Sequence, residues 1–297
     1  MRIQGRWKIN AGLLLVVCLL GVFVWLRPGK QTVVETPLLD LRNGAVNQIT
    51  LENGEHLLFE RKDSGWELVE PFHARVNQVR IEQLLAIPML SPASEYPLPE
   101  ASELPGYGLG KPFATLGIDG RKLEFGDVAP LNRRRYVRMN DRLYLLDDGF
   151  SHQLSSKSTD FVDKKLVPDQ AVIQGLLIPG LRVSKGAEGG WNALPALGQD
   201  QLQDLMMQWA TARAIEVRRG APKVLGETIE VETALGPIRF SILQKNPELI
   251  LGRNDQDLVY VMTAESSRLL LNLPKAPGAR GDRKEGDDHD HDHDDDE

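Results

Sequence analysis

The spacing of apolar and polar residues divides the chain into three stretches. Residues 11–26 read AGLLLVVCLLGVFVWL and contain no charge. After them, apolar and polar residues alternate in short runs between turn-forming residues, and this period of two is typical of strands with one buried face. From about residue 275 the chain is polar and charged, with no large apolar side chain. The pattern predicts an apolar helix, a folded body and a polar tail.

The first half of the body predicts one α+β unit. Ile49–Glu52 and His56–Glu60 flank Asn53-Gly54, which is a hairpin signal, and Gly65–Leu68 follows. Val76–Met89 predicts a short helix, because its apolar residues fall near one helical face. Further strands are expected at Phe113–Ile118, Arg121–Phe125, Arg135–Met139 and Arg142–Leu146.

The second half of the body repeats this order. Gly190-Trp191 echoes Gly65-Trp66, and a helix with apolar residues at i, i+3, i+4 and i+7 (Leu202, Leu205, Met206 and Trp209) comes next. We therefore expect Trp66 and Trp191 at equivalent buried positions. The other strands of this copy are expected at Leu181–Val183, Thr228–Thr233, Pro237–Leu243, Leu249–Gly252 and Leu258–Met262.

The predicted fold class is α+β, with two repeated units of antiparallel sheet and one covering helix for each. Whether the repeats form separate sheets or one continuous sheet is left open. The expected organisation is a membrane anchor (1–30), a first repeat (31–154), a polar linker with a short helix around Phe161–Leu166 (155–169), a second repeat (170–274) and a disordered tail (275–297).

The apolar segment predicts an uncleaved membrane anchor. Sixteen uncharged residues extend over about 24 Å as a helix, slightly short of a hydrocarbon core of about 30 Å, and Ile9 extends the apolar character backwards. A cleaved signal peptide would end in a small-x-small site, whereas Trp25-Leu26-Arg27-Pro28 stands here. Basic residues are more numerous before the segment than after it. We expect residues 9–26 to cross the bacterial inner membrane once, with the N-terminus cytoplasmic and the body periplasmic.

Charge is distributed unevenly along the chain. The formal net charge is −7, and residues 280–297, with ten acidic and three basic residues, account for all of it. The remaining residues carry 32 charges of each sign, so the body has no net field to attract nucleic acid. The single cysteine, Cys18, lies in the apolar segment, which excludes a disulfide or a thiol nucleophile in the body.

Several short motifs follow one another in the first repeat. Their order is Gly65-Trp66, Tyr107-Gly108-Leu109 with Pro112, Leu123–Asp127, Tyr136-Val137-Arg138 and Leu143–Leu146. Over about Val46–Leu166 this order resembles the domain-of-unknown-function 4340 family, while the second repeat lacks a Tyr-Gly-Leu segment. The resemblance implies a bacterial envelope protein with an N-terminal anchor, of a kind sometimes found beside gliding-type ABC export systems. It implies no catalytic residues.

Two motifs invite a ligand-binding interpretation that their context does not favour. Residues 106–111 read GYGLGK, but a phosphate-binding loop has Ser or Thr after the lysine and then opens a helix, whereas Pro112 and a strand follow here. Arg133-Arg134-Arg135, with Arg138 and Arg142, could bind phosphate or carboxylate. Charged strand edges that discourage aggregation are the simpler interpretation. There is no His-Glu-x-x-His and no Gly-x-Ser-x-Gly motif.

The tail carries the clearest ligand chemistry. His289, His291 and His293 alternate with aspartates, and imidazole with carboxylate suits zinc, nickel or copper. We expect weak binding of divalent transition metals there and no resident cofactor. A solubilising acidic tail is the alternative.

The function predicted from these patterns is a non-enzymatic binding or scaffold protein in the periplasm. Its partners are expected to be the cytoplasmic membrane and an envelope or transporter protein, with an ABC export complex suggested by the resemblance. The alternatives are a metal-buffering protein that acts through the tail and an envelope hydrolase whose site the sequence does not reveal.

We predict that removal of residues 287–297 abolishes binding of zinc or nickel in isothermal titration calorimetry. Binding by the full-length protein should weaken as the pH falls through about 6.5, because protonated imidazole is no ligand. The melting temperature without metal should be unchanged by the deletion. Equal metal binding by both forms would place the site in the folded body instead.

Overall fold

The computed structural model describes residues 36–271, except 42–43, 64, 131–132, 187–188, 221–225 and 254. These residues form two antiparallel sheets and two compact units. The first unit comprises the described residues of 36–61 and 79–155, and the second comprises those of 62–78 and 156–271. The two separate sheets settle a point that the sequence left open.

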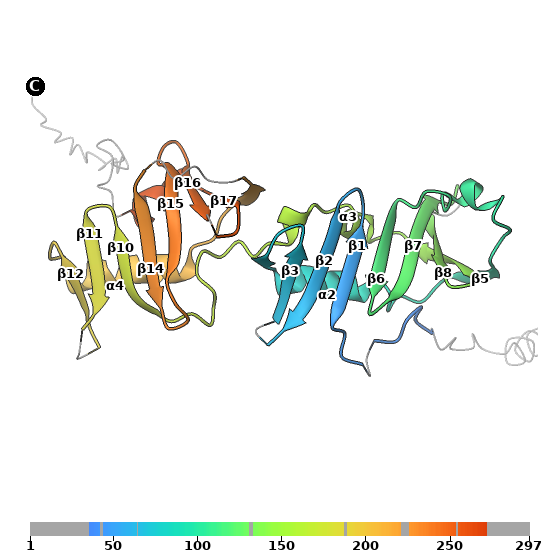
Figure 1. The fold of residues 1–297 in the computed structure, drawn as a ribbon, viewed down its shortest axis with the longest axis horizontal. Helices are drawn as coiled ribbons and strands as arrows, with labels where there is room; N and C mark the ends of the chain where they lie inside the picture. Colours follow the sequence, from blue (N-terminus) through green and yellow to red (C-terminus); the bar gives the residue numbers. More distant parts are fainter. Residues whose placement is uncertain are drawn as a thin grey trace, which may run out of the picture. The chain divides into compact units, whose positions relative to one another are not determined.

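The first sheet has nine strands in the order β4-β3-β2-β1-β6-β7-β8-β9-β5 (Figure 1). The hairpin predicted around Asn53-Gly54 is confirmed, because Ile49 pairs with Phe59 across it. The strands are β1 (Gln48–Glu52), β2 (His56–Lys62), β3 (Gly65–Glu70), β4 (Ala74–Arg75), β5 (Ser94–Pro97), β6 (Ala114–Ile118), β7 (Arg121–Val128), β8 (Arg134–Met139) and β9 (Arg142–Asp147).

The second sheet has eight strands in the order β12-β11-β10-β14-β15-β16-β17-β13 (Figure 1). All of its pairings are antiparallel. The strands are β10 (Ile173–Ile178), β11 (Leu181–Lys185), β12 (Trp191–Leu194), β13 (Glu216–Arg219), β14 (Thr228–Thr233), β15 (Ile238–Gln244), β16 (Leu249–Arg253) and β17 (Leu258–Met262).

The two sheets repeat one topology. Three strands that follow one another in the chain lie at one side and a helix comes next. The first strand after the helix lies at the other edge, where it pairs with the last strand of the sheet. β3 corresponds to β12, β5 to β13 and β9 to β17 when the two orders are aligned. The difference between the described strands is β4, which lies beside β3 and has no described counterpart beside β12. The α+β repeat predicted from the sequence therefore extends to the order of the strands.

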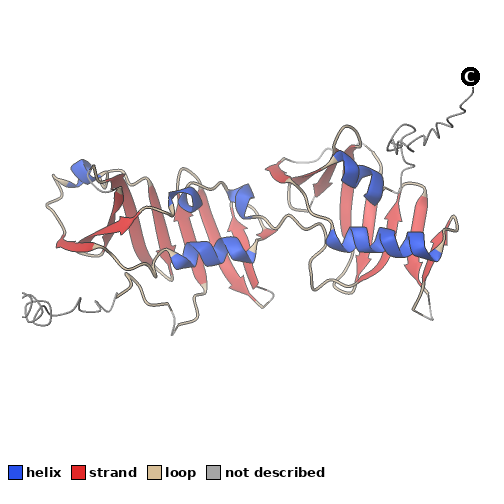
Figure 2. Cartoon of the chain, turned by 180° about the vertical axis from the view of Figure 1, so that it is seen from behind, coloured by secondary structure: helices blue, strands red, loops and turns tan. Residues whose placement is uncertain are grey.

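Each sheet carries two helices on one face, where one was expected (Figure 2). The long ones, α2 (Gln78–Ala86) and α4 (Gln199–Thr211), were predicted. The additional ones are α3 (Ser151–Leu154) and α5 (Ala264–Leu270), each after the last strand of its repeat. They were missed because four to seven residues are too few for a helical period to show.

The core of the second unit lies between α4 and the sheet. Its helix stripe at Leu202, Leu205, Met206 and Trp209 is buried, as predicted. The Trp209 ring lies 6.3 Å from that of Phe240 on β15, and its indole N–H donates to a carbonyl at the end of α5 at 3.0 Å. The buried positions of β10, β11, β14 and β15 belong to the same cluster, so the alternate positions face away from α4.

Three short edge strands, β4, β5 and β13, were not predicted. They contain two to four residues, too short for an alternating pattern to be recognised. The segment expected as a linker helix around Phe161–Leu166 forms a 3₁₀ turn slightly earlier, at η2 (Ser158–Phe161). Phe161 and Leu166 are both buried, so this polar stretch still contributes to a core.

The predicted anchor at residues 9–26 and the predicted tail lie outside the described residues. Within residues 36–271, as far as they are described, no helix is long and apolar enough to cross a membrane.

The first residue of each long helix binds the tryptophan that precedes it. The Gln78 side chain accepts from the N–H of Trp66 at 3.2 Å and donates to its carbonyl at 3.3 Å. Gln199 donates to the carbonyl of Trp191 at 2.8 Å. The same contact in both repeats fixes where the helix starts relative to its strand, and it supports the alignment of Trp66 with Trp191.

The two tryptophans differ in burial. Trp66 is buried, as predicted, whereas Trp191 is only half-buried, so the prediction for Trp191 was partly wrong. Trp191 opens the edge strand β12, while Trp66 lies on a strand that has neighbours on both sides in the sheet. The difference follows from the missing counterpart of β4.

We predict that Gln78→Ala increases amide exchange at Trp66, because the variant leaves a backbone N–H and a carbonyl without their partner. Two lost hydrogen bonds should cost about 1–3 kcal/mol locally, and Gln199→Ala, which loses one, about half of that. Hydrogen–deuterium exchange followed by mass spectrometry measures both. Gln203→Ala, at an exposed position of α4, is the control for helix propensity. Equal protection in all three variants would show that these contacts are dispensable.

Candidate functional site

The residues predicted to bind metal, His289, His291 and His293, lie outside the part of the chain that the structure describes. Within the described part, no group of three or more His, Cys, Asp or Glu side chains is arranged to hold a metal ion. The prediction of metal binding by the tail therefore stays a prediction.

The Gly-rich loop at residues 106–111 packs on the first sheet. It follows the 3₁₀ helix η1 (Leu104–Tyr107), which ends at Gly108 with a φ of 70°. A Cβ on Gly126 of β7 would lie 2.2 Å from the carbonyl oxygen of Tyr107, so only glycine allows this approach. The Tyr107 ring then meets the Tyr136 ring edge-on at 5.0 Å. The loop is a structural connection, as its context in the sequence favoured.

The arginines of β8 and β9 are already engaged in ion pairs. Side-chain nitrogens lie within 3.4 Å of carboxylate oxygens in the pairs Arg134–Asp147, Arg135–Asp148, Arg138–Glu124 and Arg142–Glu95. Four arginines with intramolecular partners do not form a ready anion site. The simpler interpretation, charged strand edges that discourage aggregation, does not apply to these strands, because β8 and β9 each have a neighbour on both sides in the sheet.

Arg135 differs from the other three arginines because its side chain is buried. Its side chain and that of Asp148 are each only 10% exposed, and their charged atoms lie 2.8 Å apart. Arg135 also donates to the carbonyl of Gly126 and stacks over the Phe113 ring at 4.6 Å. Removing one partner would leave a buried charge uncompensated, so this pair holds β8 to its surroundings.

The surface with the clearest binding character is the open face of the second sheet, opposite α4. Five residues lie in register across five strands there, and we call them the open-face row. Arg182 pairs with Leu194 and with Leu177, Leu177 pairs with Glu230, and Glu230 pairs with Arg239. Along each strand, side chains alternate between the two faces of the sheet. The residues of the row occupy the positions that alternate with the core residues, so their side chains point away from α4.

The open-face row combines exposed apolar side chains with an unpaired cation. Leu194 is 76% and Leu177 is 36% exposed. Between them lies Arg182, whose side chain has no hydrogen-bond or ion-pair partner among the described residues. At the other end Arg239 pairs with Glu230 through two contacts, at 3.0 and 3.4 Å. An unpaired guanidinium beside exposed leucines suits an acidic and partly apolar partner.

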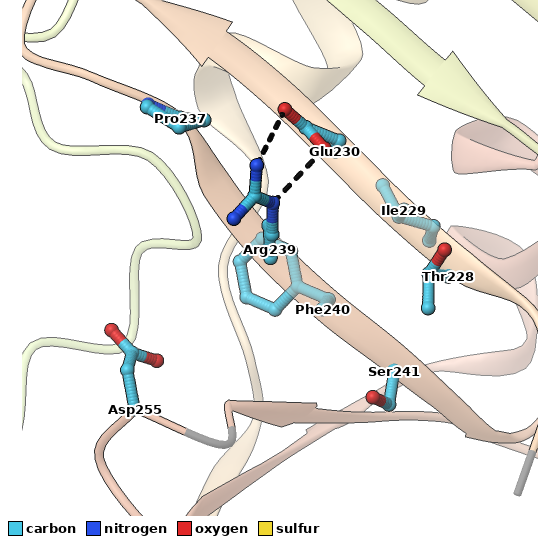
Figure 3. Close-up of a pocket in the computed structure, with 8 residues that line it drawn as sticks. All are labelled: Thr228, Ile229, Glu230, Pro237, Arg239, Phe240, Ser241 and Asp255. Atoms are coloured by element: carbon cyan, nitrogen blue, oxygen red, sulfur yellow. Dashed lines mark hydrogen bonds and ion pairs between the residues drawn. The ribbon is translucent and has the colours of Figure 1, made fainter. Parts of the chain in front are cut away.

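A groove of about 380 Å³ adjoins this row over β14 and β15 (Figure 3). The side chains of Glu230 and Arg239 meet within it, and Asp255 lies on the opposite wall. The complete lining is Thr228, Ile229, Glu230, Pro237, Arg239, Phe240, Ser241 and Asp255. Paired strands bring Thr228 beside Ser241 and Glu230 beside Arg239, so the register of one hairpin builds most of the groove.

Hydrogen bonds stabilise the ionised forms of two charged groups in the groove. The hydrogen bond with Glu230 raises the pKa of the Arg239 guanidinium. The hydrogen bond from Arg253, at 2.9 Å, lowers the pKa of the Asp255 carboxyl. Both groups therefore stay ionised at neutral pH. The groove offers the hydroxyl of Thr228, an ion pair and a carboxylate, which suit hydrogen bonding to an extended polar chain.

A second polar cleft, of about 210 Å³, lies within the second unit beside β4. Arg75 donates to Asp163 and to the carbonyl of Lys165, both at 3.0 Å, and Lys165 pairs with Asp169. The backbone N–H of Asp163 donates to the carbonyl of Arg75 at 2.9 Å. These contacts hold β4 in place, so we assign the cleft a structural role.

Sequence reasoning missed the open-face row and the groove. Their residues are scattered over five strands, and none belongs to a motif. Only the register of the strands brings them together, and a single sequence carries no direct signal of register between distant strands.

No family model, curated protein or solved structure matches this chain.

We predict that Asp148→Asn destabilises the protein by about 3–5 kcal/mol, because Arg135 would remain buried without its counter-ion. The neighbouring pair provides a matched control, since Asp147 is 82% exposed and Asp147→Asn should cost less than about 1 kcal/mol. Urea denaturation followed by circular dichroism compares the two variants. A similar loss in both would refute a special role for the buried pair.

Proposed function

We propose that this chain is a binding or scaffold protein of the bacterial cell envelope. In this proposal residues 9–26 anchor it in the inner membrane and the open face of the second sheet holds a partner protein in the periplasm. The observation that carries the proposal is the open-face row, in which Leu177, Arg182 and Leu194 are exposed in register. Exposed apolar residues around an unpaired arginine are typical of protein interfaces.

The groove beside the row supports the same function. Its ion pair between Glu230 and Arg239 and its Thr228 hydroxyl provide polar contacts at the rim of an apolar surface, which is the usual anatomy of an interface. The repeated fold supplies a rigid support, because cross-strand pairs hold each side chain of the row in place. The row and the groove adjoin one another through Glu230 and Arg239, so together they form one surface for a partner protein.

The compartment and the partner class are inferred from the sequence. The apolar segment and the basic residues before it favour a periplasmic body. The resemblance to the domain-of-unknown-function 4340 family favours an envelope or transporter partner, such as a gliding-type ABC export complex. A reporter that is active only in the periplasm should be active when fused after Glu297.

Metal buffering by the tail is the second candidate function. It rests on the alternation of histidine and aspartate from 288 to 294. Exposed imidazole and carboxylate groups can wrap around an ion without a preformed site, although with little selectivity.

The main proposal predicts that a photoreactive residue in place of Leu177 cross-links to an envelope protein in living cells. The same residue in place of Met207, which is exposed on α4, is the control for the opposite face. Mass spectrometry of the cross-linked band identifies the partner. Equal cross-linking from both positions, or none from position 177, would contradict the proposal.

A further inference from the structure

The edge of the second sheet at β12 differs from the other sheet edges. The strands that end the two sheets, as far as they are described, are β4 with Arg75, β5 with Glu95 and Pro97, β13 with Glu216 and two arginines, and β12. Natural sheets protect their edges with charges, prolines or very short strands. The sequence of β12 is Trp-Asn-Ala-Leu, with no charge and no proline.

The backbone directions of β12 follow from two hydrogen bonds. Residues of an antiparallel strand turn their N–H and C=O groups alternately to one neighbour and to the other. The N–H of Gly186 donates to the carbonyl of Gly190 at 2.7 Å, so the backbone N–H and C=O groups of Gly190 point toward β11. The carbonyl of Trp191 accepts from Gln199 instead, so the backbone groups of Trp191 point away from β11. By the same alternation, Ala193 turns both its N–H and its carbonyl to the free edge.

The first sheet closes the corresponding edge. Gln78 binds both the N–H and the carbonyl of Trp66, and two residues further Leu68 pairs with Ala74 of β4. In the second sheet Gln199 binds the carbonyl of Trp191, and among the described residues no strand pairs with the outer side of β12, the side away from β11. The repeat therefore shows what fits at the open position, which is a short antiparallel strand with a small residue opposite Ala193.

We propose that the free edge of β12 binds an extended acidic segment of a partner protein as an added antiparallel strand. This inference rests on the proposed function and specifies how the partner protein is bound. The segment takes the place that β4 has in the first repeat, where buried Ala74 is the small residue. Main-chain hydrogen bonds to an exposed edge are a common means of peptide recognition.

Charge complementarity determines the chemistry of the segment. A residue opposite Leu194 lies on the open face, two strands from Arg182, which is within reach of a long side chain. An acidic residue there gives Arg182 its missing partner. The next residue of the partner segment lies opposite Ala193 and is small. Two positions further along the segment, an apolar residue lies opposite Trp191 and can pack against its ring.

A second copy of the chain fits less well than a separate partner. A strand of four residues offers far fewer contacts than the roughly 20–30 residues a side of a standard interface. A symmetric pair of β12 edges would also bring no acidic residue to Arg182, since β12 has none. In β4 the short pairing is reinforced by the ion pair of Arg75 with Asp163. A partner segment gains similar reinforcement from Arg182.

The test uses the full-length protein in detergent solution and a fluorescein-labelled peptide, acetyl-Thr-Phe-Glu-Ala-Thr-Val-Thr-amide. Fluorescence polarisation should show saturable binding. N-methylation of the peptide alanine should weaken binding at least about tenfold, because it removes a donor and adds bulk between the strands. No saturable binding, or equal binding of the two peptides, would overturn the proposal.

Variants of the protein locate the binding site. Ala193→Pro removes only an outward N–H, which an edge strand tolerates, and should weaken binding at least about tenfold. Ala193→Ser keeps the N–H and should bind like the wild type. Arg182→Gln should weaken binding about three- to tenfold, whereas Arg268→Gln, which changes an arginine of α5 that is already paired with Glu265, should not. If the Arg182 and Arg268 variants lose binding equally, the acidic specificity is wrong.

Two further outcomes separate this proposal from others. A photoreactive residue at position 194 that cross-links the protein to itself, without peptide, would show that a second copy occupies the edge and would overturn the proposal. If position 177 cross-links to an envelope protein equally in wild type and Ala193→Pro, the proposed function stands while the β12 edge is excluded as the site.

Discussion

Both halves of this protein obey one constraint, which is that an antiparallel sheet must bury one face and satisfy its edges. Apolar side chains at alternate positions turn toward the helices, and α4 with its buried Trp209 completes the core of the second unit. The remaining positions must then face outward. Each sheet is left with an open face and two edge strands.

The comparison between the repeats shows where they have diverged. The glutamine at the start of each long helix binds the tryptophan before it, so the junction of strand and helix is the same in both. The edge beyond that tryptophan is closed by β4 in the first sheet, whereas no strand of the described part of the chain closes it at β12 in the second. The first repeat therefore shows how a strand can pair at the position beyond β12, because β4 occupies the equivalent position beside β3.

Charged side chains serve different ends in the two repeats. In the first, the arginines of β8 and β9 pair with carboxylates, and the buried Arg135–Asp148 pair belongs to the structure itself. In the second, Arg182 has no partner among the described residues and lies between two exposed leucines. An unpaired guanidinium can form new charge-assisted hydrogen bonds with a carboxylate of a partner protein, whereas a paired one must first lose its own partner. The second repeat is therefore better suited to bind an acidic partner.

The sequence by itself determined the α+β class, the internal repeat, both long helices and most long strands, because periodicity and turn residues are local properties. It also determined that the Gly-rich loop lacks the context of a phosphate site. The edge strands β4, β5 and β13 and the helices α3 and α5 could not be predicted, since elements this short take their conformation from their neighbours. Only the tertiary structure decided that Leu177, Arg182 and Leu194 share one row and that Ala193 faces a free edge. Both facts depend on which strands pair and in which register, and that choice is made by the packing of the whole sheet.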